Sequence, residues 1–476
     1  MKAEALEKVN VYLAVLGGGP GGYSAAIMAA QLGIKVALIE KDKLGGTCLN
    51  RGCIPTKFLI SAVNLLRSRS KLGYYGLSGS LKLDLKSLID GKNRMVSRLR
   101  TGLENLLRSW DIKIIHGVGR LRSPRRIEVT AGDEGGYEVE ASKVILAPGS
   151  RCPDKGEIAS EVEGVLNTDE ALELEEPPES LLVVGGGPSG IELAYVYAWL
   201  GSRVTLAEAM PQILPGEDME TADMLKFSLE KTGIKVLTGR KLKGVTRGNG
   251  TVKAFFETGE GDEAFEAEKV LLAIGRKANI ENLGLKDVDV KTKRGRILVN
   301  EFMETAAKGV YAVGDAAGGL YAHTAFIEGE AAARNAFGGR VKVNFEAIPR
   351  CLYGSPEVAG VGLTEKQAKA QGYRVKIGRF PYMANGRAAT LLETEGMVKI
   401  VADAKTGIIL GVQIIGFEAT ELIAEAALAL KLKCTVEDLA STVHAHPTLS
   451  EALREAALDA MDRALHKPYR QRENQG

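Results

Sequence analysis

A strand, a glycine-rich turn and a helix follow one another twice along this chain, and this repeat constrains the fold more than any other feature. In the first copy, an apolar strand over residues 11–16 leads into the turn, a small-residue helix is predicted over residues 23–32, and a second strand ends at Glu40. The turn has the pattern G-x-G-x-x-G, made by Gly17, Gly19 and Gly22. Such glycines allow a tight turn, close approach of a pyrophosphate and close packing of helix on strand, while the helix N-terminus attracts the phosphates. This unit is predicted to bind a dinucleotide, with Glu40 accepting the ribose hydroxyls.

The second copy repeats the first at the same spacing. Its strands are predicted over residues 181–184 and 203–207, and its turn glycines are Gly185, Gly187 and Gly190. Glu208 follows the first of these glycines by 23 residues, the interval that also separates Glu40 from Gly17. Two such units predict two dinucleotides, and a flavin with a nicotinamide is the obvious pair. A carboxylate at Glu208 repels a 2′-phosphate and favours NAD over NADP. The alternative is that one copy is a vestigial fold without a ligand.

Length and charge exclude several other classes of protein. A chain of 476 residues is too long for one core and suggests about three domains. A net charge of +2 gives no sign of nucleic-acid binding, and no apolar run approaches the roughly 18 residues of a membrane-spanning helix. The N-terminal segment carries acids and no apolar core, so a signal peptide is not expected and the cytoplasm is the predicted compartment. The tail from residue 467 is polar and is expected to fray.

Two of the five cysteines, Cys48 and Cys53, lie close together in the glycine-rich segment from Gly45 to Lys57. A bridge needs Cα atoms roughly 4.4–6.8 Å apart, whereas five steps along a regular helix rise about 7.5 Å. A disulfide here therefore requires a distorted turn, for which Gly45, Gly46 and Gly52 supply backbone freedom. Two free thiols in a loop are the alternative. The other three cysteines are scattered, so a disulfide scaffold is excluded and one close pair in a reducing compartment suggests redox chemistry.

An aspartate and two histidines in the second half of the chain stand at positions that suit cofactor binding or catalysis. A strand over residues 310–313 ends in Gly314 and Asp315, which suits contact with a ribityl chain; an aspartate that caps the next helix is the alternative. From residue 348 onward the pattern changes to an antiparallel sheet with helices and no glycine loop. His444 and His446 precede Glu451, which is predicted to open a helix and to orient one imidazole as a base. A metal pair and ordinary capping residues are alternatives, but this spacing is a poor zinc site and no metal is expected.

The segment Gly45-Gly-Thr-Cys-Leu-Asn-Arg-Gly-Cys-Ile-Pro-Thr-Lys57 is similar to the active-site signature of the pyridine nucleotide–disulfide oxidoreductases. The C-terminal segment from His444 to Glu451 most resembles the dihydrolipoamide dehydrogenases of that family, and the resemblance covers essentially the whole chain. It implies that Cys48 exchanges with the dithiol substrate and that Cys53 lies against the flavin as the charge-transfer thiolate. It also implies that His446 is the general base.

Further roles follow from the same resemblance. Glu451 would orient His446, and Lys57 would lie near the flavin and pair with Glu192. FAD contacts would come from Gly17, Gly19, Gly22, Glu40, Gly46, Thr47, Gly149, Asp315 and Ala322. NAD contacts would come from Gly185, Gly187, Gly190, Glu208 and Gly275.

The fold implied is α/β, with two Rossmann-like dinucleotide-binding domains and an α+β C-terminal dimerisation domain. Residues 1–155 would bind FAD, completed by the central segment 281–346; residues 156–280 would bind NAD, and residues 347–476 would form the interface. The family is homodimeric, with the His–Glu pair of one subunit serving the disulfide of the other. The expected partner is dihydrolipoamide or the lipoyl domain of a 2-oxoacid dehydrogenase or glycine-cleavage complex.

Three residues depart from the family pattern, and other functions are possible for a chain with this fold. Pro148 stands where threonine is usual, and Thr324 and Phe326 stand where a lysine and an acid are usual, so substrate and flavin tuning are open. A glutathione-type reductase favours NADPH, which Glu208 argues against. A reductase of metal substrates carries an extra C-terminal cysteine pair, and no cysteine follows Cys434. A non-catalytic structural subunit would not need the complete catalytic set.

Overall fold

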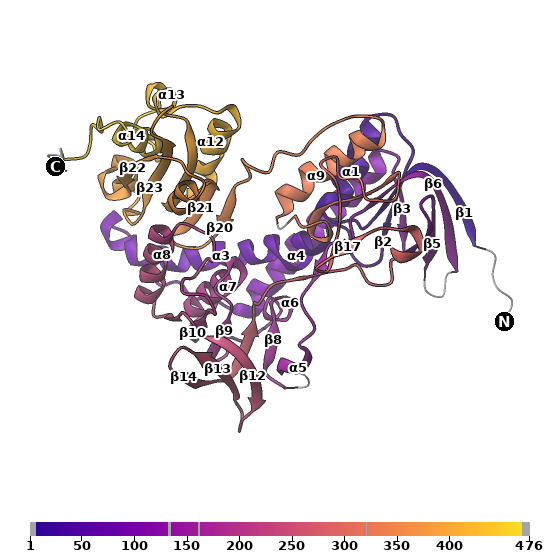
Figure 1. Ribbon diagram of the computed structural model, residues 1–476. Helices are drawn as coiled ribbons and strands as arrows, with labels where there is room; N and C mark the ends of the chain where they lie inside the picture. Colours follow the sequence, from indigo (N-terminus) through magenta and orange to yellow (C-terminus); the bar gives the residue numbers. More distant parts are fainter. Residues whose placement is uncertain (1–5, 132–134, 160–161, 320, 469–476) are drawn as a thin grey trace.

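The computed structural model describes residues 6–131, 135–159, 162–319 and 321–468. Within these ranges, two α/β units and a C-terminal α+β unit each build a sheet of their own, and Figure 1 shows them as three regions of the molecule. This arrangement confirms the predicted fold class. The first five residues of the N-terminal segment and most of the predicted polar tail lie outside the described residues.

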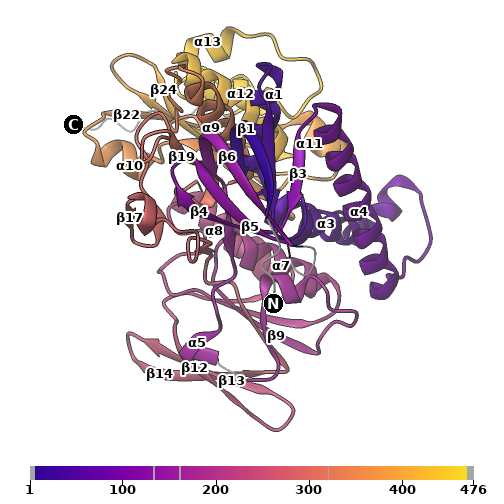
Figure 2. The ribbon, with the colours of Figure 1, turned by 90° about the vertical axis from the view of Figure 1, so that its right-hand side faces the viewer.

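The first unit is built on a mostly parallel sheet. Its strands are β1 (Glu7–Leu16), β2 (Val36–Glu40), β3 (Lys113–His116), β4 (Val118–Ser123), β5 (Arg126–Thr130), β6 (Gly136–Leu146) and, from far along the chain, β19 (Val310–Ala312). The order is β3-β2-β1-β6-β5-β4, and β19 runs parallel to the end of β6. Residues 281–346 therefore return to the first sheet through β19. The exact bounds of the domains remain predictions. Figure 2 shows β1 and β6 side by side.

Helices of the first unit carry the glycine loop and the cysteines. They are α1 (Pro20–Gln31), α2 (Gly46–Arg51), α3 (Cys53–Ser68), η1 (Arg69–Tyr75), α4 (Leu85–Ser109), η4 (Gly314–Ala316) and α9 (Ala322–Ala336). Helix α1 begins three residues earlier than predicted because proline, which lacks an N–H and has a fixed φ, suits the first helical turn. Strand β1 also begins earlier, at Glu7, because its first residues pair with β6 although every second side chain is exposed.

The second unit repeats this plan with five parallel strands in the order β11-β10-β9-β15-β8. Its elements are α5 (Gly156–Ala159), β8 (Val165–Asn167), α6 (Thr168–Ala171), β9 (Ser180–Val184), α7 (Pro188–Trp199), β10 (Arg203–Ala207), α8 (Met219–Lys231), β11 (Lys235–Leu237), β12 (Lys241–Arg247), β13 (Val252–Thr258), β14 (Gly261–Ala267) and β15 (Lys269–Leu272). Sequence reasoning missed α8, although Ala222, Leu225 and Leu229 have the spacing of a helix face that packs on a core.

Short pieces connect the second unit back to the first: β7 (Ser150–Arg151), β16 (Lys277–Ala278), η3 (Lys286–Val288), β17 (Thr292–Lys293) and β18 (Arg296–Ile297). Strands β7 and β16 pair antiparallel, so the two crossings between the units run side by side. This ladder brings the residues that follow β6 and β15 together at one place.

The C-terminal unit contains an antiparallel sheet, as predicted, and its strands lie in the order β20-β21-β24-β23-β22. Its elements are β20 (Arg350–Leu352), β21 (Glu357–Gly362), α10 (Glu365–Ala370), β22 (Val375–Pro381), η5 (Tyr382–Ala384), α11 (Gly386–Thr390), β23 (Met397–Asp403), β24 (Ile409–Gly416), α12 (Ala419–Leu432), α13 (Val436–Ser441) and α14 (Glu451–Asp459). Helix α14 begins at Glu451, the residue predicted to open it.

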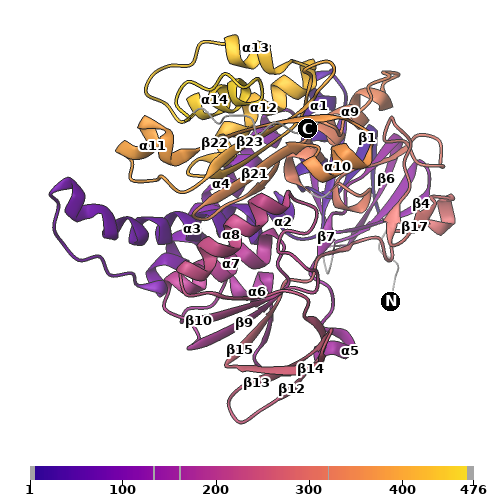
Figure 3. The ribbon, with the colours of Figure 1, turned by 60° about the vertical axis from the view of Figure 1, so that its left-hand side comes forward.

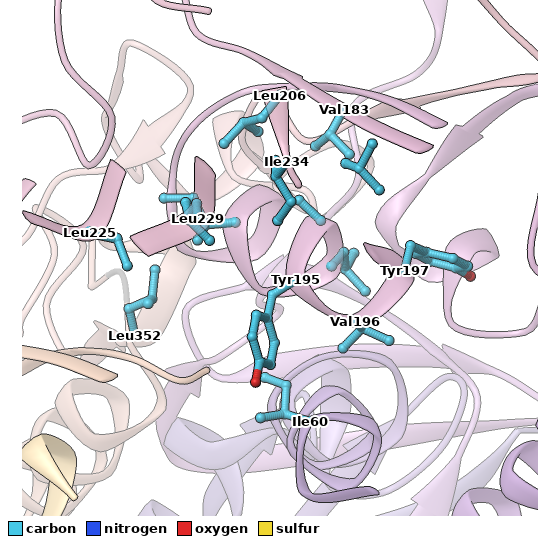
Figure 4. Packing of buried hydrophobic residues seen from close by; sticks show 14 of the residues in the cluster. Ile60, Val183, Tyr195, Val196, Tyr197, Leu206, Leu225, Leu229, Ile234 and Leu352 are labelled. Carbon is cyan, nitrogen blue, oxygen red and sulfur yellow. The ribbon is translucent and has the colours of Figure 1, made fainter. Parts of the chain in front are cut away.

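One hydrophobic cluster joins the cysteine helix to the other two units. It contains Ile60 of α3, Tyr195 of α7 and Leu352 of β20, all nearly fully buried (Figure 4). Figure 3 shows α3 beside α7, and the Tyr195 hydroxyl donates a hydrogen bond of 2.7 Å to Asn64 on α3. Apolar burial stabilises this contact by about 1.5–3 kcal/mol for each large side chain. This cluster fixes the position of α3 and therefore of Cys53, the first residue of that helix.

Candidate active site

Glycine conformations set the backbone around the two cysteines. Gly45 and Gly46 have φ of +91° and +58°, in the left-handed region that favours glycine. A Cβ on Gly46 would lie 2.8 Å from the Cα of Gly19, so this segment touches the first glycine loop. Gly52 then separates α2 from α3 with non-helical torsions. The distorted turn expected from the spacing is present, and it brings the two sulfurs together.

The structure describes the pair as a dithiol: all five cysteines carry free thiols, and the Cys48 thiol donates a hydrogen bond to the sulfur of Cys53. This hydrogen bond, assisted by the charge of Lys57, lowers the pKa of Cys53 to about 7, against the effect of burial. The same contact, together with burial, raises the pKa of Cys48. Cys53 is also the first residue of α3, where the helix dipole favours a negative charge. Cys53 is thus the thiolate of the pair and Cys48 the thiol.

Lys57 and Glu192 form an ion pair one helical turn beyond Cys53. The Lys57 ammonium donates to both carboxylate oxygens at 2.9 and 2.8 Å, and Glu192 is only 3% exposed. Tyr353 adds its backbone N–H to Glu192 at 3.0 Å and places its ring 4.5 Å from the Lys57 nitrogen. Burial raises the pKa of Glu192, while the Lys57 charge opposes this effect. The structure therefore brings together two residues that are 135 positions apart, and Tyr353, which sequence reasoning missed, joins them.

In the first glycine loop, only the second glycine of the motif leaves open space, and this is where a pyrophosphate would approach the backbone. A Cβ on Gly17 would lie 2.0 Å from the carbonyl oxygen of Ala147, and one on Gly22 would lie 1.8 Å from that of Gly17. On Gly19, by contrast, a Cβ would meet only the Gly46 Cα, at 3.7 Å. The buried carboxylate of Glu40 accepts the Gly18 N–H at 2.6 Å and so holds the loop closed. This cradle fits FAD.

The second glycine loop has the same geometry. A Cβ on Gly185 would lie 2.4 Å from the oxygen of Ala273, one on Gly190 would lie 1.9 Å from that of Gly185, and one on Gly187 would meet nothing within 4 Å. Glu208 accepts the Gly186 N–H at 2.6 Å. These residues fit the second dinucleotide, NAD, as closely as the first loop fits FAD.

Other predicted cofactor residues meet in one network where the two units join. The Ser150 hydroxyl donates to Asp315 and accepts from Arg276 Nε at 2.9 Å. Arg276 Nη2 also donates to the Thr47 hydroxyl at 3.2 Å, next to Cys48. Gly149 and Gly275 border this network with φ of +65° and +110°, and Ala322 begins α9 nearby in the chain.

Sequence reasoning missed Ser150, Arg276 and Glu328. The Glu328 carboxylate is 2% exposed and accepts the Gly314 N–H at 2.6 Å, and burial raises its pKa to about 7. Their position in the sequence could have indicated Ser150 and Arg276, since each directly follows a glycine that lies three residues beyond the end of a strand. No local signal marks Glu328.

The residues that depart from the family pattern lie close to these groups. Phe326 packs on Tyr23, with ring centroids 5.6 Å apart, and Tyr23 belongs to α1, the helix that follows the first glycine loop. Thr324 is buried, and the Pro148 carbonyl accepts a hydrogen bond of 3.0 Å from Asn279. Uncharged side chains therefore stand at positions 324 and 326, where the family has a lysine and an acid.

His446 and Glu451 form the predicted imidazole–carboxylate pair. His446 Nδ1 lies 2.8 Å from Glu451 Oε1, and Glu451 Oε2 accepts the Thr448 N–H at 2.8 Å. Burial alone would raise the pKa of Glu451, but these hydrogen bonds hold it below its ordinary value. The His446 side chain is 78% exposed, and neither cysteine lines the cavity of about 410 Å³ around it. Within one chain, therefore, the structure does not bring His446 to Cys48.

His444 is held differently, with one ring nitrogen 2.9 Å from Glu425 and the other 3.0 Å from the Thr442 carbonyl oxygen. Across the described ranges, no cluster of three or more histidine, cysteine or acidic side chains is suited to a metal ion. The same residues include no helix long and apolar enough to cross a membrane.

Comparison with known proteins agrees with this geometry. The family model of pyridine nucleotide-disulphide oxidoreductases matches residues 11–337, and that of their dimerisation domain matches residues 348–457. Proteins named dihydrolipoyl dehydrogenase from Thermus scotoductus and Bacillus subtilis are 45% and 41% identical to this chain, each over 95% of the chain and 98% of the relative.

Solved structures give the same picture. LpdA from Mycobacterium tuberculosis matches with a TM-score of 0.87 and 29% identity, over 94% of this chain and 99% of that one. The HOCl-induced flavoprotein disulfide reductase RclA from Escherichia coli matches with a TM-score of 0.83 and 25% identity, over the same shares of the two chains.

Proposed function

Because the chain belongs to the pyridine nucleotide-disulphide oxidoreductase family, we infer that it oxidises a dihydrolipoyl dithiol and delivers two electrons to NAD⁺, with FAD as its bound cofactor. The observation that carries this conclusion is the Cys48–Cys53 pair, a thiol hydrogen-bonded to a thiolate at the break between α2 and α3. The relatives named dihydrolipoyl dehydrogenase support the choice of substrate. When bound, FAD supplies the two-electron acceptor for the reduced cysteines, and NAD⁺ supplies the hydride acceptor.

We propose that catalysis begins with a proton transfer at His446. The Glu451 carboxylate can only accept a hydrogen bond, so His446 carries its proton on Nδ1 and presents the lone pair of Nε2. Nε2 takes the proton of one substrate thiol, and the resulting thiolate attacks Cys48 Sγ in the oxidised enzyme. The bond between the two cysteine sulfurs breaks, and its electron pair leaves on Cys53.

The second substrate thiol completes the exchange. Its sulfur attacks the substrate sulfur of the mixed disulfide, the bond to Cys48 breaks, and the second proton ends on the Cys48 sulfur. The substrate leaves as a cyclic disulfide, oxidised by two electrons, and the enzyme holds Cys48 as thiol and Cys53 as thiolate. This is the protonation state that the hydrogen bond between the two sulfurs and the pKa of about 7 for Cys53 support.

The geometry of His446 supports a homodimer. His446 is exposed, the cavity beside it contains neither cysteine, and residues 348–457 match a dimerisation domain. We propose that the partner subunit's His446 serves Cys48. The physiological substrate is then dihydrolipoamide carried on the lipoyl domain of a 2-oxoacid dehydrogenase or glycine-cleavage complex, and the proposed compartment is the cytoplasm.

Steady-state kinetics test this function. Purified holoenzyme should reduce NAD⁺ with dihydrolipoamide, should prefer NAD⁺ to NADP⁺, and should not reduce glutathione disulfide with NADH. Cys48→Ser and Cys53→Ser should each lower turnover at least about 100-fold because the exchange needs both sulfurs, whereas Cys434→Ser, in the C-terminal unit, should keep it. Turnover that survives in Cys48→Ser would refute the assignment.

A further inference from the structure

A second imidazole–carboxylate pair lies beside the one that holds His446. His466 Nδ1 is 3.0 Å from Glu455 Oε1, and Glu455 Oε2 accepts the backbone N–H groups of Leu465 and His466 at 3.0 and 3.2 Å. The Glu451 carboxylate makes the same two kinds of contact: Oε1 lies against the His446 imidazole, and Oε2 accepts the backbone N–H of Thr448.

The two pairs share one helix and one cavity. Glu451 and Glu455 are four residues apart on α14, so they lie on the same face of the helix with Cβ atoms about 6 Å apart. His446 and His466 both line the cavity of about 410 Å³. Their side chains are 78% and 68% exposed, whereas the two carboxylates are 24% and 5% exposed. Each ring is therefore held from the protein side and open toward the cavity.

The hydrogen bonds leave one nitrogen of each ring able to accept a proton. Because a carboxylate only accepts, Nδ1 of His466 carries a proton and its Nε2 presents a lone pair, as in His446. Neither Nε2 has a hydrogen-bond partner among the described residues. His444, in the same cavity, has both nitrogens against oxygen atoms, and its contact with Glu425 raises its pKa, so neither of its nitrogens is open toward the cavity.

We propose that His466 takes the proton from His446 during turnover and releases it to solvent, an inference that rests on the function proposed above. Oxidation of a dithiol with hydride transfer to NAD⁺ leaves one proton per turnover. That proton leaves the substrate sulfur for His446 Nε2 while the electron pair stays on sulfur, and it then passes through water in the cavity to His466 Nε2. His466 acts through His446 and does not touch the dithiol.

The remaining charges around the cavity favour release of that proton. Arg454 lines it and donates its Nε to the Ala440 carbonyl oxygen at 3.0 Å, and His444 lines it with raised pKa. The positive charge of Arg454 opposes a lasting charge on His466, while Glu455 keeps the ring in place.

His466→Asn tests the relay, because an asparagine amide can still donate to Glu455 but cannot carry a proton at neutral pH. With holoenzyme, dihydrolipoamide and NAD⁺ in 2 mM buffer, we expect kcat to fall about tenfold, less than the roughly 100-fold cost of losing a group that contacts the reacting atom. Added imidazole should restore kcat, and KM should not change. His116→Asn, on β3 of the first unit, is the matched control and should behave as wild type.

Each outcome decides the question. An unchanged kcat in His466→Asn at low buffer refutes the relay, and a reduced kcat that imidazole does not restore shows a structural role and refutes it too. If His466→Asn does not fold, His466→Gln is judged by the same two criteria, and if neither variant folds the pair is structural and the relay is rejected. A wild-type enzyme without dihydrolipoamide activity would instead reject the proposed function, so the two failures are distinguishable.

Discussion

Removal of the Lys57 charge should destabilise the protein in a pH-dependent way. Lys57→Met leaves the carboxylate of Glu192, 3% exposed, without the cation that lies 2.8 Å away. Breaking a buried ion pair from one side costs about 3–5 kcal/mol, and the Tyr353 N–H alone offsets little of this. We expect the free energy of unfolding to fall by about 3 kcal/mol at pH 8.

The sign of the pH dependence follows from the direction of the Glu192 pKa. Burial raises it, so the folded protein binds this proton more tightly than the unfolded chain does, and stability falls as pH rises from the ordinary pKa of 4.5 through the folded value. Without Lys57 the folded pKa is higher still. The loss in Lys57→Met should therefore be largest at pH 8 and should shrink as pH falls, because a protonated Glu192 needs no cation.

Urea unfolding of the reduced holoenzyme at pH 5.5, 7 and 8.5 measures this difference. The double variant Lys57→Met/Glu192→Gln removes both charges and should recover at least about 2 kcal/mol at pH 8. Lys376→Met, at an exposed position on β22, should change stability by less than about 0.5 kcal/mol. A loss in Lys57→Met that is the same at all three pH values, or that the second substitution does not relieve, would refute the reasoning.

Three further predictions concern the cofactor loops, the thiolate and the contact between units. Gly22→Ala, whose Cβ would lie 1.8 Å from a carbonyl oxygen, should yield colourless protein, whereas Gly190→Ala should stay yellow and lose saturable NAD⁺ binding; absorbance and calorimetry distinguish the two. Alkylation of the reduced enzyme by iodoacetamide should rise with pH around a midpoint near 7, as Cys53 ionises, and a midpoint above 8.5 would contradict the geometry. Lys399, 3% exposed, lies 3.0 Å from the buried Asp218, so Lys399→Met should cost about 3–5 kcal/mol in urea unfolding while Lys399→Met/Asp218→Asn recovers part of it.

Sequence and structure differ in what they reveal about the C-terminal histidines. The spacing from His446 to Glu451 indicated an imidazole–carboxylate pair because five residues of one loop can bring the two side chains together. The His466–Glu455 pair escaped notice, since it depends on a turn after α14 that folds the chain back on that helix. The resemblance to a family predicted Lys57–Glu192, which no local pattern could show.

The sequence by itself determined the local features: two glycine loops with an acid 23 residues after the first glycine, a distorted turn between two cysteines, and a helix opened by Glu451. These depend on backbone torsions and short-range sterics, which a few neighbouring residues specify. Only the tertiary structure decided the long-range contacts, such as Arg276 on Ser150 and Thr47, Glu328 on Gly314, and the separation of His446 from both cysteines of its own chain. Such contacts arise when whole units pack on a shared core, and their partners are too far apart in sequence for any spacing to record them.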